Sequence, residues 1–423
     1  MTDQQAVAQK LSPEHLVTLY EITATMNASL DFDDALNNIM DSVLSVTKAQ
    51  RGFLIAADEE TESLSTLVVK GVQGETLERD GYSTTVVSEV MKTRQALLTN
   101  DAQFDARLQA GQSIIMRGLR AVLCAPMLVQ DRIVGILYVD TSMRAGNFSQ
   151  ADRDLLGAVA GQAGIALENA RLYTVAVEKG RMERELQMAS EIQQSLLPSM
   201  MPNLPGYEIA ARWEAAREVA GDFYDAFSLG DDHFVTVIAD VSDKGAPAAL
   251  FMAVARTMIR SHSHAGLSPV ETMARTNDLI LEDAESGMFV TAYHSHFYAN
   301  GMSRHVNAGH NPPLVYNHAD NTVSFMPRGG RAIGWFPDNP LSEVMLELQP
   351  GDFIVFYTDG LTEAENLSRD FYGEERLVQV VMRSCTLTAD EILGEILRDV
   401  MQFVDGAPPF DDLTIMVVRY VGT

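Results

Sequence analysis

The stretch Asp240-Val-Ser-Asp-Lys-Gly-Ala-Pro-Ala-Ala-Leu-Phe-Met252 decides the fold of the C-terminal half of the chain. An apolar, β-rich run precedes it, so Asp240 stands at the end of a predicted strand. Gly245 marks a turn. Pro247 suits the first turn of a helix, where its fixed φ and missing N–H are tolerated. The sequence therefore predicts a strand, a glycine turn and a helix, with a carboxylate at the junction.

Three further acidic motifs have the same character. They are Ala220-Gly221-Asp222-Phe223-Tyr224-Asp225, Phe356-Tyr357-Thr358-Asp359-Gly360 and Phe410-Asp411-Asp412-Leu413-Thr414. Taken singly, each is typical of a turn or a solvated cap. An Asp buried alone after a strand is costly, so several that converge indicate shared cations. Oxygen ligands suit Mg²⁺ and Mn²⁺, and the lack of Cys or paired His argues against structural zinc.

The first part of the chain predicts one α+β domain of roughly 150 residues. Its expected elements are helices within 13–47, 86–92 and from Ser149 onward, strands at 51–57, 64–70 and 96–99, and a hairpin of 121–129 with 133–140. Polar residues between two β-branched runs indicate the hairpin, and Ser-Gln-Ala-Asp at 149–152 is typical of a capping box.

This segment resembles a GAF domain over 14–173. The resemblance rests on RGFLIAAD (51–58), LRAVLCAPMLVQDRIVGILYVDTS (119–142) and FSQADRDLLGAVAGQAGIALENARLY (148–173). GAF domains bind cyclic nucleotides, tetrapyrroles, other small molecules or only a partner subunit. No residue set here selects a nucleotide or a bilin, so we identify no ligand-binding residue and expect at most an unknown small-molecule ligand.

A helical linker is expected over 174–205. Positions 172, 175, 179, 182, 186, 189, 193 and 196 alternate steps of three and four, and most of them are apolar. This heptad pattern favours a parallel coiled coil that makes a homodimer and joins sensor to effector. The alternative is a single amphipathic helix packed on a neighbour. Pro198 ends the helix.

The block 206–423 predicts two stacked sheets flanked by helices. Short β runs recur at 234–239, 292–297, 314–316, 353–357 and 413–420, and helical patterns at 247–261, 269–282, 375–383 and 389–403. The strands do not alternate strictly with helices, so a parallel sheet of βαβ units is not expected.

From residue 193 to 420 the chain closely resembles the bacterial PPM-type (type 2C-like) phosphatases of the SpoIIE/RsbU kind. Seven motifs agree in order: QQSLLP (193–198), VAGDFYD (219–225), DVSDKGAPAALFM (240–252), MFVTA (288–292), NAGHNPPL (307–314), YTDGLTEA (357–364) and FDDLTIMVV (410–418). The resemblance implies an α/β/β/α sandwich and a protein serine/threonine phosphatase, a hydrolase that uses two Mn²⁺ or Mg²⁺ ions.

The resemblance also assigns site residues. Asp240 is expected to bridge both metals, and Val241 to contribute its backbone carbonyl. Asp222 would serve the first metal, partly through water; Asp359 and Asp411 would serve the second. Asp240 and Asp222 would activate the metal-bound water that attacks phosphoserine or phosphothreonine. Asp412 is the less expected ligand.

The chain departs from the type 2C pattern near Asp240. Ser242 stands where eukaryotic relatives carry a His proposed as general acid, which leaves the proton donor unassigned. We interpret His310 as stiffening its Pro-rich loop rather than replacing that His. Lys244 is expected to be a solvated charge, although it could meet substrate phosphate. Asp243 replaces a glycine found in many relatives, and its charge could aid a third, weaker metal.

The composition excludes some partners. The formal net charge is −27, which repels nucleic acid and anionic membranes. The N-terminus shows no signal peptide, no apolar run is long enough to span a membrane, and two cysteines offer no disulfide framework. A cytoplasmic location is expected.

The resemblance implies a phosphorylated protein substrate, namely a STAS-type anti-sigma-factor antagonist. A signal on the GAF domain would act through the linker helix. Two alternatives stay open: a catalytically degenerate dimeric scaffold, or a GAF small-molecule sensor whose ligand response is the main output. The four retained Asp positions argue against degeneracy.

Overall fold

The computed structural model describes residues 20, 32–58, 63–71, 78–108, 121–141, 148–283 and 287–422. They form two compact units that divide between Lys179 and Gly180. The helix expected before residue 28 lies outside the described residues, apart from position 20. The expected domain limits after 173 and 205 stay predictions.

The N-terminal unit is built on a five-stranded antiparallel sheet in the order β2-β1-β5-β4-β3. Its elements are α3 (Phe32–Thr47), β1 (Arg51–Asp58), β2 (Ser63–Gly71), α4 (Thr84–Thr93), β3 (Leu97–Thr99), the 3-10 turn η1 (Ala106–Leu108), β4 (Ala121–Val129), β5 (Arg132–Thr141) and α6 (Gln150–Leu196). The expected hairpin is confirmed, because β4 pairs with β5 around Gln130-Asp131.

Helices cover both faces of this sheet. On one face α3 and the first turns of α6 bury residues such as Met40 and Val159. On the other face α4 covers Phe53, Tyr82 and Tyr138, and the ring of Phe53 lies edge-on to both tyrosines, 5.9 and 5.7 Å between centroids. Burial of each large side chain contributes about 1.5–3 kcal/mol. The antiparallel sheet therefore has a hydrophobic core on each face, and helices cover both cores.

Helix α6 is continuous over 47 residues. Its start is fixed by the predicted capping box, in which the Ser149 N–H donates to Asp152 (2.7 Å) and the Asp152 N–H donates to the Ser149 hydroxyl (3.2 Å). Leu172, Val175 and Met182 are 52, 52 and 64% exposed. None of the helices in the described ranges has the length and apolarity needed to cross a membrane.

The C-terminal unit contains two five-stranded sheets, in the orders β13-β10-β9-β8-β7 and β12-β11-β14-β15-β6. Its elements are β6 (Tyr207–Glu214), β7 (Phe223–Ser228), β8 (His233–Val241), α7 (Ala246–His264), α8 (Pro269–Asp283), β9 (Val290–Tyr298), β10 (Met302–Ala308), β11 (Leu314–Asn317), β12 (Thr322–Phe325), β13 (Glu343–Glu347), β14 (Phe353–Tyr357), α9 (Asp359–Thr362), α10 (Glu374–Arg383), α11 (Ala389–Val404) and β15 (Leu413–Tyr420). The strands and helices expected in this block are all present, and five further strands accompany them.

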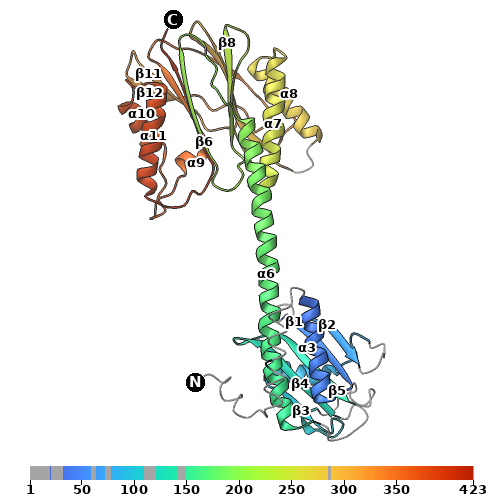
Figure 1. The fold of residues 1–423 in the computed structure, drawn as a ribbon. Coiled ribbons are helices and arrows are strands. Elements are labelled where there is room, and N and C mark those ends of the chain that lie inside the picture. The colour runs from blue at the N-terminus through green and yellow to red at the C-terminus, as the bar shows by residue number, and fades with distance from the viewer. Residues whose placement is uncertain are drawn as a thin grey trace. The chain divides into compact units, whose positions relative to one another are not determined.

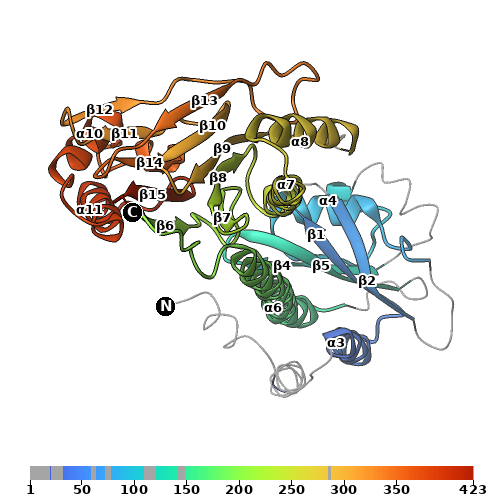
Figure 2. The same cartoon turned by 90° about the horizontal axis from the view of Figure 1, so that it is seen from above.

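The two sheets lie face to face between two pairs of helices. Helices α7 and α8 cover the first sheet, and α10 and α11 cover the second (Figures 1 and 2). Between the sheets the rings of Phe234 and Phe297 stack 4.9 Å apart, with Phe356 beside them. The expected α/β/β/α sandwich is therefore confirmed.

Candidate functional site

The predicted aspartates lie at the ends of neighbouring strands in both sheets. Asp240 is the next-to-last residue of β8, and Asp222 comes directly before β7, which pairs with β8. Asp359 begins α9 directly behind β14, and Asp411 precedes β15, which pairs with β14. The Thr414 hydroxyl donates to Asp222 at 2.9 Å and so joins the two sheets at this edge. The fold brings the four carboxyl groups to one place.

Burial, together with neighbouring acids, raises the pKa of Asp222, Asp240 and Asp359. Burial, and next the charge of Asp240, hold the pKa of Asp222 well above its usual range, although the Thr358 and Thr414 hydroxyls act against this. Burial, and next the charge of Asp359, raise the pKa of Asp240 to about 7. Burial, followed by Asp411, also raises the pKa of Asp359. The site therefore holds more negative charge than its surroundings stabilise, which suits divalent cations with oxygen ligands.

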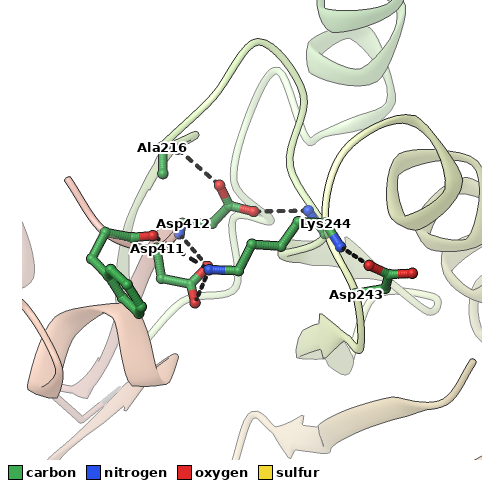
Figure 3. Close-up of polar contacts among 7 residues, drawn as sticks. Ala216, Asp243, Lys244, Asp411 and Asp412 are labelled. Atoms are coloured by element: carbon green, nitrogen blue, oxygen red, sulfur yellow. Dashed lines mark hydrogen bonds and ion pairs between the residues drawn. The ribbon is translucent and has the colours of Figure 1, made fainter. Parts of the chain in front are cut away.

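Lys244 lies against one of these acids. Its ammonium donates to the Asp411 carboxylate at 2.8 Å and to the Phe410 carbonyl at 3.3 Å, and it stands 4.7 Å from the centre of the Phe410 ring (Figure 3). The side chain is 40% exposed, in keeping with the expected solvated charge, but it is also paired with Asp411. Lys244 therefore supplies the cation nearest to Asp411.

Asp412 holds the loop that carries Asp222. One carboxylate oxygen accepts the Ala216 N–H at 2.8 Å (Figure 3), and the other accepts the Gly221 N–H, also at 2.8 Å. No three His, Cys, Asp or Glu side chains in the described part of the chain stand in ligand positions. That Asp412 is the less expected ligand stays a prediction.

Two glycines allow close packing between the segments that carry the acids. A Cβ at Gly360 would lie 1.9 Å from the Asp412 carbonyl oxygen, closer than any real contact. A Cβ at Gly221 would lie 3.0 Å from the Val241 carbonyl oxygen, the group predicted to face a metal. Any larger residue at either position would push apart the segments that bear the acids.

The residues that depart from the type 2C pattern are tied to the backbone. The Ser242 hydroxyl accepts the Phe289 N–H at 2.9 Å, and the Ser242 N–H donates to the Phe289 carbonyl at 2.9 Å. Asp243 has a φ of 81°, a region that favours glycine, and its carboxylate accepts the Lys244 N–H at 2.8 Å. The glycine of many relatives fits this backbone.

His310 is buried and neutral. Burial lowers the pKa of His310 to about 4, and its Nδ1 lies 2.9 Å from the Thr291 hydroxyl. Asn307 brackets the same residue, since its side chain donates to the His310 carbonyl (3.0 Å) and accepts the His310 N–H (2.8 Å). The imidazole is held at one point and the backbone of His310 at two, which favours the loop-stiffening interpretation.

Sequence reasoning missed two supports of the site. Asp225 is fully buried between Arg256 and Arg260 of α7, at 3.0 and 2.8 Å, and so fastens α7 to β7. The i, i+4 spacing of two arginines on one predicted helix could have suggested a buried acid as partner. The second support is Gln193, a residue of the QQSLLP motif, whose side chain bonds the backbone of Ala220.

A cleft of about 460 Å³ opens beside Asp359. Its walls include His310, Asn311, Glu363 and Arg328. Arg328 is the one Lys or Arg among the described residues that line this cleft. A phosphate group entering beside Asp359 would meet this guanidinium.

An α/β/β/α sandwich with aspartates at facing strand ends defines the class of PPM-type phosphatases, and comparison with known proteins agrees. Residues 230–421 match the family described as Stage II sporulation protein E (SpoIIE), and residues 29–168 match the GAF domain. The solved SiaA-PP2C domain of Pseudomonas aeruginosa superposes with a TM-score of 0.51 at 21% identity, covering 58% of this chain and 99% of that one. That likeness concerns the fold.

Two curated relatives extend the comparison. The chain is 32% identical over 308 residues to Protein IcfG of Synechocystis sp., which covers 64% of this chain and 47% of that protein. It is 28% identical over 243 residues to Phosphoserine phosphatase RsbU of Bacillus subtilis, covering 56% of this chain and 70% of that protein. The chain thus spans about half of the length of Protein IcfG. It combines a GAF domain with a PPM-type phosphatase domain of the SpoIIE family.

Proposed function

We propose that the C-terminal unit is a metal-dependent phosphatase that hydrolyses phosphoserine or phosphothreonine on a partner protein. The observation that carries the proposal is the group of buried acids at one sheet edge, whose pKa values are raised by burial and by one another. Such a group is unfavourable by itself and becomes favourable around cations. The name of the relative RsbU, a phosphoserine phosphatase, supports the same reaction.

In this proposal Asp240 would serve both ions, the Val241 carbonyl and Asp222 would serve the first, and Asp359 and Asp411 would serve the second. When bound, two Mn²⁺ or Mg²⁺ ions would activate a water molecule and neutralise charge on the phosphoryl group. Asp222 and Asp240 hold the position for that water, and Thr414 orients Asp222. Asp411 must first leave Lys244, which frees the ammonium at the edge of the site.

The cleft beside Asp359 would receive the phosphorylated residue. Arg328 would bind phosphate oxygens there, because a guanidinium matches the geometry of phosphate. The substrate we favour is a phosphorylated STAS-type anti-sigma-factor antagonist in the cytoplasm.

The GAF domain would control the phosphatase through α6. Leu172, Val175 and Met182 have the spacing of a coiled-coil seam and are more than half exposed, which supports a homodimer formed along this helix. A small-molecule ligand of the GAF domain would act through the same helix.

The test measures phosphate release from a phosphoserine protein in the presence of Mn²⁺, with the wild-type chain and an Asp240→Ala variant. We expect release by the wild-type chain and loss of at least about 100-fold in the variant, because several kcal/mol of transition-state stabilisation depend on the ions. Equal release by both chains would refute the proposal. No release by either would favour the degenerate scaffold.

A further inference from the structure

The last turn of α6 carries a buried amide side chain. Gln193 is 3% exposed, whereas its neighbour Gln194 is exposed. The Gln193 Nε2 donates to the Ala220 carbonyl at 2.5 Å, and the Ala220 N–H donates to the Gln193 Oε1 at 3.1 Å. The amide therefore pairs with both backbone groups of one residue, as a neighbouring strand would.

Ala220 stands two residues before Asp222, and both Gly221 and Asp222 have a tether of their own. The Gly221 N–H donates to Asp412 at 2.8 Å, and the Asp222 carbonyl accepts the Trp213 indole N–H at 2.9 Å. Three consecutive residues are thus held by side chains from α6, from the loop before β15 and from β6. All of these groups belong to the C-terminal unit.

Breaking the contact between Gln193 and Ala220 would cost free energy. The side chains of Gln193 and Ala220 are buried, and a buried amide or peptide group without a partner costs about 1–3 kcal/mol. If Gln193 moved away, the Ala220 N–H and carbonyl would lose their partners at the same time. The loop would then have to shift toward water, and Asp222 would shift with it.

We propose that Gln193 is a positioning residue for Asp222, which makes the end of α6 part of the metal site. The inference rests on the proposed function, since it assigns to Asp222 a metal that this function requires. A rotation or slide of α6 at this turn would withdraw the amide from Ala220 and loosen Asp222. The position of the end of α6 and the affinity of the site for the metal are then thermodynamically coupled.

The experiment compares three full-length variants with the wild-type chain. Gln193→Met keeps the length of the side chain and removes its hydrogen bonds, and Gln193→Ala removes both. Gln194→Ala is the matched control, because it makes the same truncation one residue away on the exposed side of the helix. Mn²⁺ binding is measured by titration calorimetry, together with thermal unfolding and phosphate release over a range of Mn²⁺ concentrations.

We expect Gln193→Met and Gln193→Ala to weaken Mn²⁺ binding about 10- to 100-fold, as substitutions behind metal ligands do. Excess Mn²⁺ should restore much of the maximal rate in Gln193→Met. Gln194→Ala should bind Mn²⁺ like the wild-type chain. This pattern, with cooperative unfolding retained in Gln193→Met, supports a positioning role.

An unchanged Mn²⁺ affinity in Gln193→Met overturns the inference, even if its melting temperature falls, because the residue is then merely structural. A failure of the proposed function looks different. In that case the wild-type chain itself binds no Mn²⁺, or Asp240→Ala binds it equally well, and both ideas are lost together.

Discussion

Lys244 donates to Asp411 at 2.8 Å, so a residue of the turn behind β8 already neutralises an acid that is proposed to hold a metal ion. The ammonium and a divalent ion cannot both occupy the same side of this carboxylate. The first prediction follows from that competition.

Lys244→Met should tighten Mn²⁺ binding. An ion pair that is partly exposed contributes about 0.2–1 kcal/mol, so its removal should lower the Mn²⁺ dissociation constant up to about five-fold. Titration calorimetry at fixed ionic strength measures the change. Arg331→Met is the control, because Arg331 contacts Phe336 instead of an acid of the site. Weaker binding in Lys244→Met would mean that the lysine organises the site.

Gly360→Ala should destabilise the C-terminal unit. The new Cβ would lie 1.9 Å from the Asp412 carbonyl oxygen, so the loop bearing Asp411 must move. Overpacking of this kind costs about 1–3 kcal/mol, and phosphate release should fall with it. Denaturant unfolding measures the loss. Gly394→Ala in α11 is the control, since a Cβ there meets nothing within 4 Å and alanine favours a helix. An equal response of both variants would contradict the close contact.

The contribution of two buried histidines to the unfolding free energy should fall as the pH drops below about 6.5. Burial lowers the pKa of His296 to about 4, with His233 and Arg304 acting in the same direction, and lowers the pKa of His294 well below its usual value. The folded chain therefore favours neutral imidazoles. Their stabilisation is complete above the unfolded pKa and is lost as the pH falls from about 6.5 through about 4.

His296 alone corresponds to roughly 3 kcal/mol across that window. In urea unfolding at several pH values between 7.5 and 4.5, the wild-type chain should lose stability relative to His296→Gln as the pH falls. His318→Gln is a suitable control, because His318 is exposed and follows β11, a strand of the other sheet. A slope that His296→Gln leaves unchanged would show that other groups cause the acid loss.

Val175→Glu should weaken the proposed dimer. Val175 belongs to the heptad seam of α6 and is 52% exposed, whereas Val177 is 49% exposed and lies off the seam. Loss of one buried Val side chain per helix costs about 1.5 kcal/mol, so the dimer dissociation constant should rise at least about ten-fold. Light scattering across a dilution series measures the mass. If Val177→Glu weakens the dimer equally, the predicted position of the seam is wrong.

Much of the C-terminal unit was predictable because strands that end in Asp are bounded by strong local signals. The run before Asp240 is apolar, and the turn and the proline behind it mark the start of α7. The strands that were missed, such as β6 and β13, are short or mix polar with apolar residues. Their pairing depends on neighbours far along the chain.

The pairings inside the site were less predictable. Asp411 and Asp412 are adjacent in sequence, yet one meets a lysine and the other meets two backbone amides. Gln193 was visible only as part of a family motif and as a polar position in a heptad seam. Its partner is the backbone of Ala220. Every residue has a backbone carbonyl, so the sequence cannot show which one accepts a hydrogen bond.

The chain has two tryptophans, and both lie beside loops of the site. The indole N–H of Trp213 donates to the Asp222 backbone, and the ring of Trp335 stacks 4.3 Å from the ring of Phe289, whose N–H donates to Ser242. Indole emission responds to changes in hydrogen bonding and stacking. The protein therefore carries built-in optical reporters, and unlabelled fluorescence can follow both sides of the site as ions or substrates arrive.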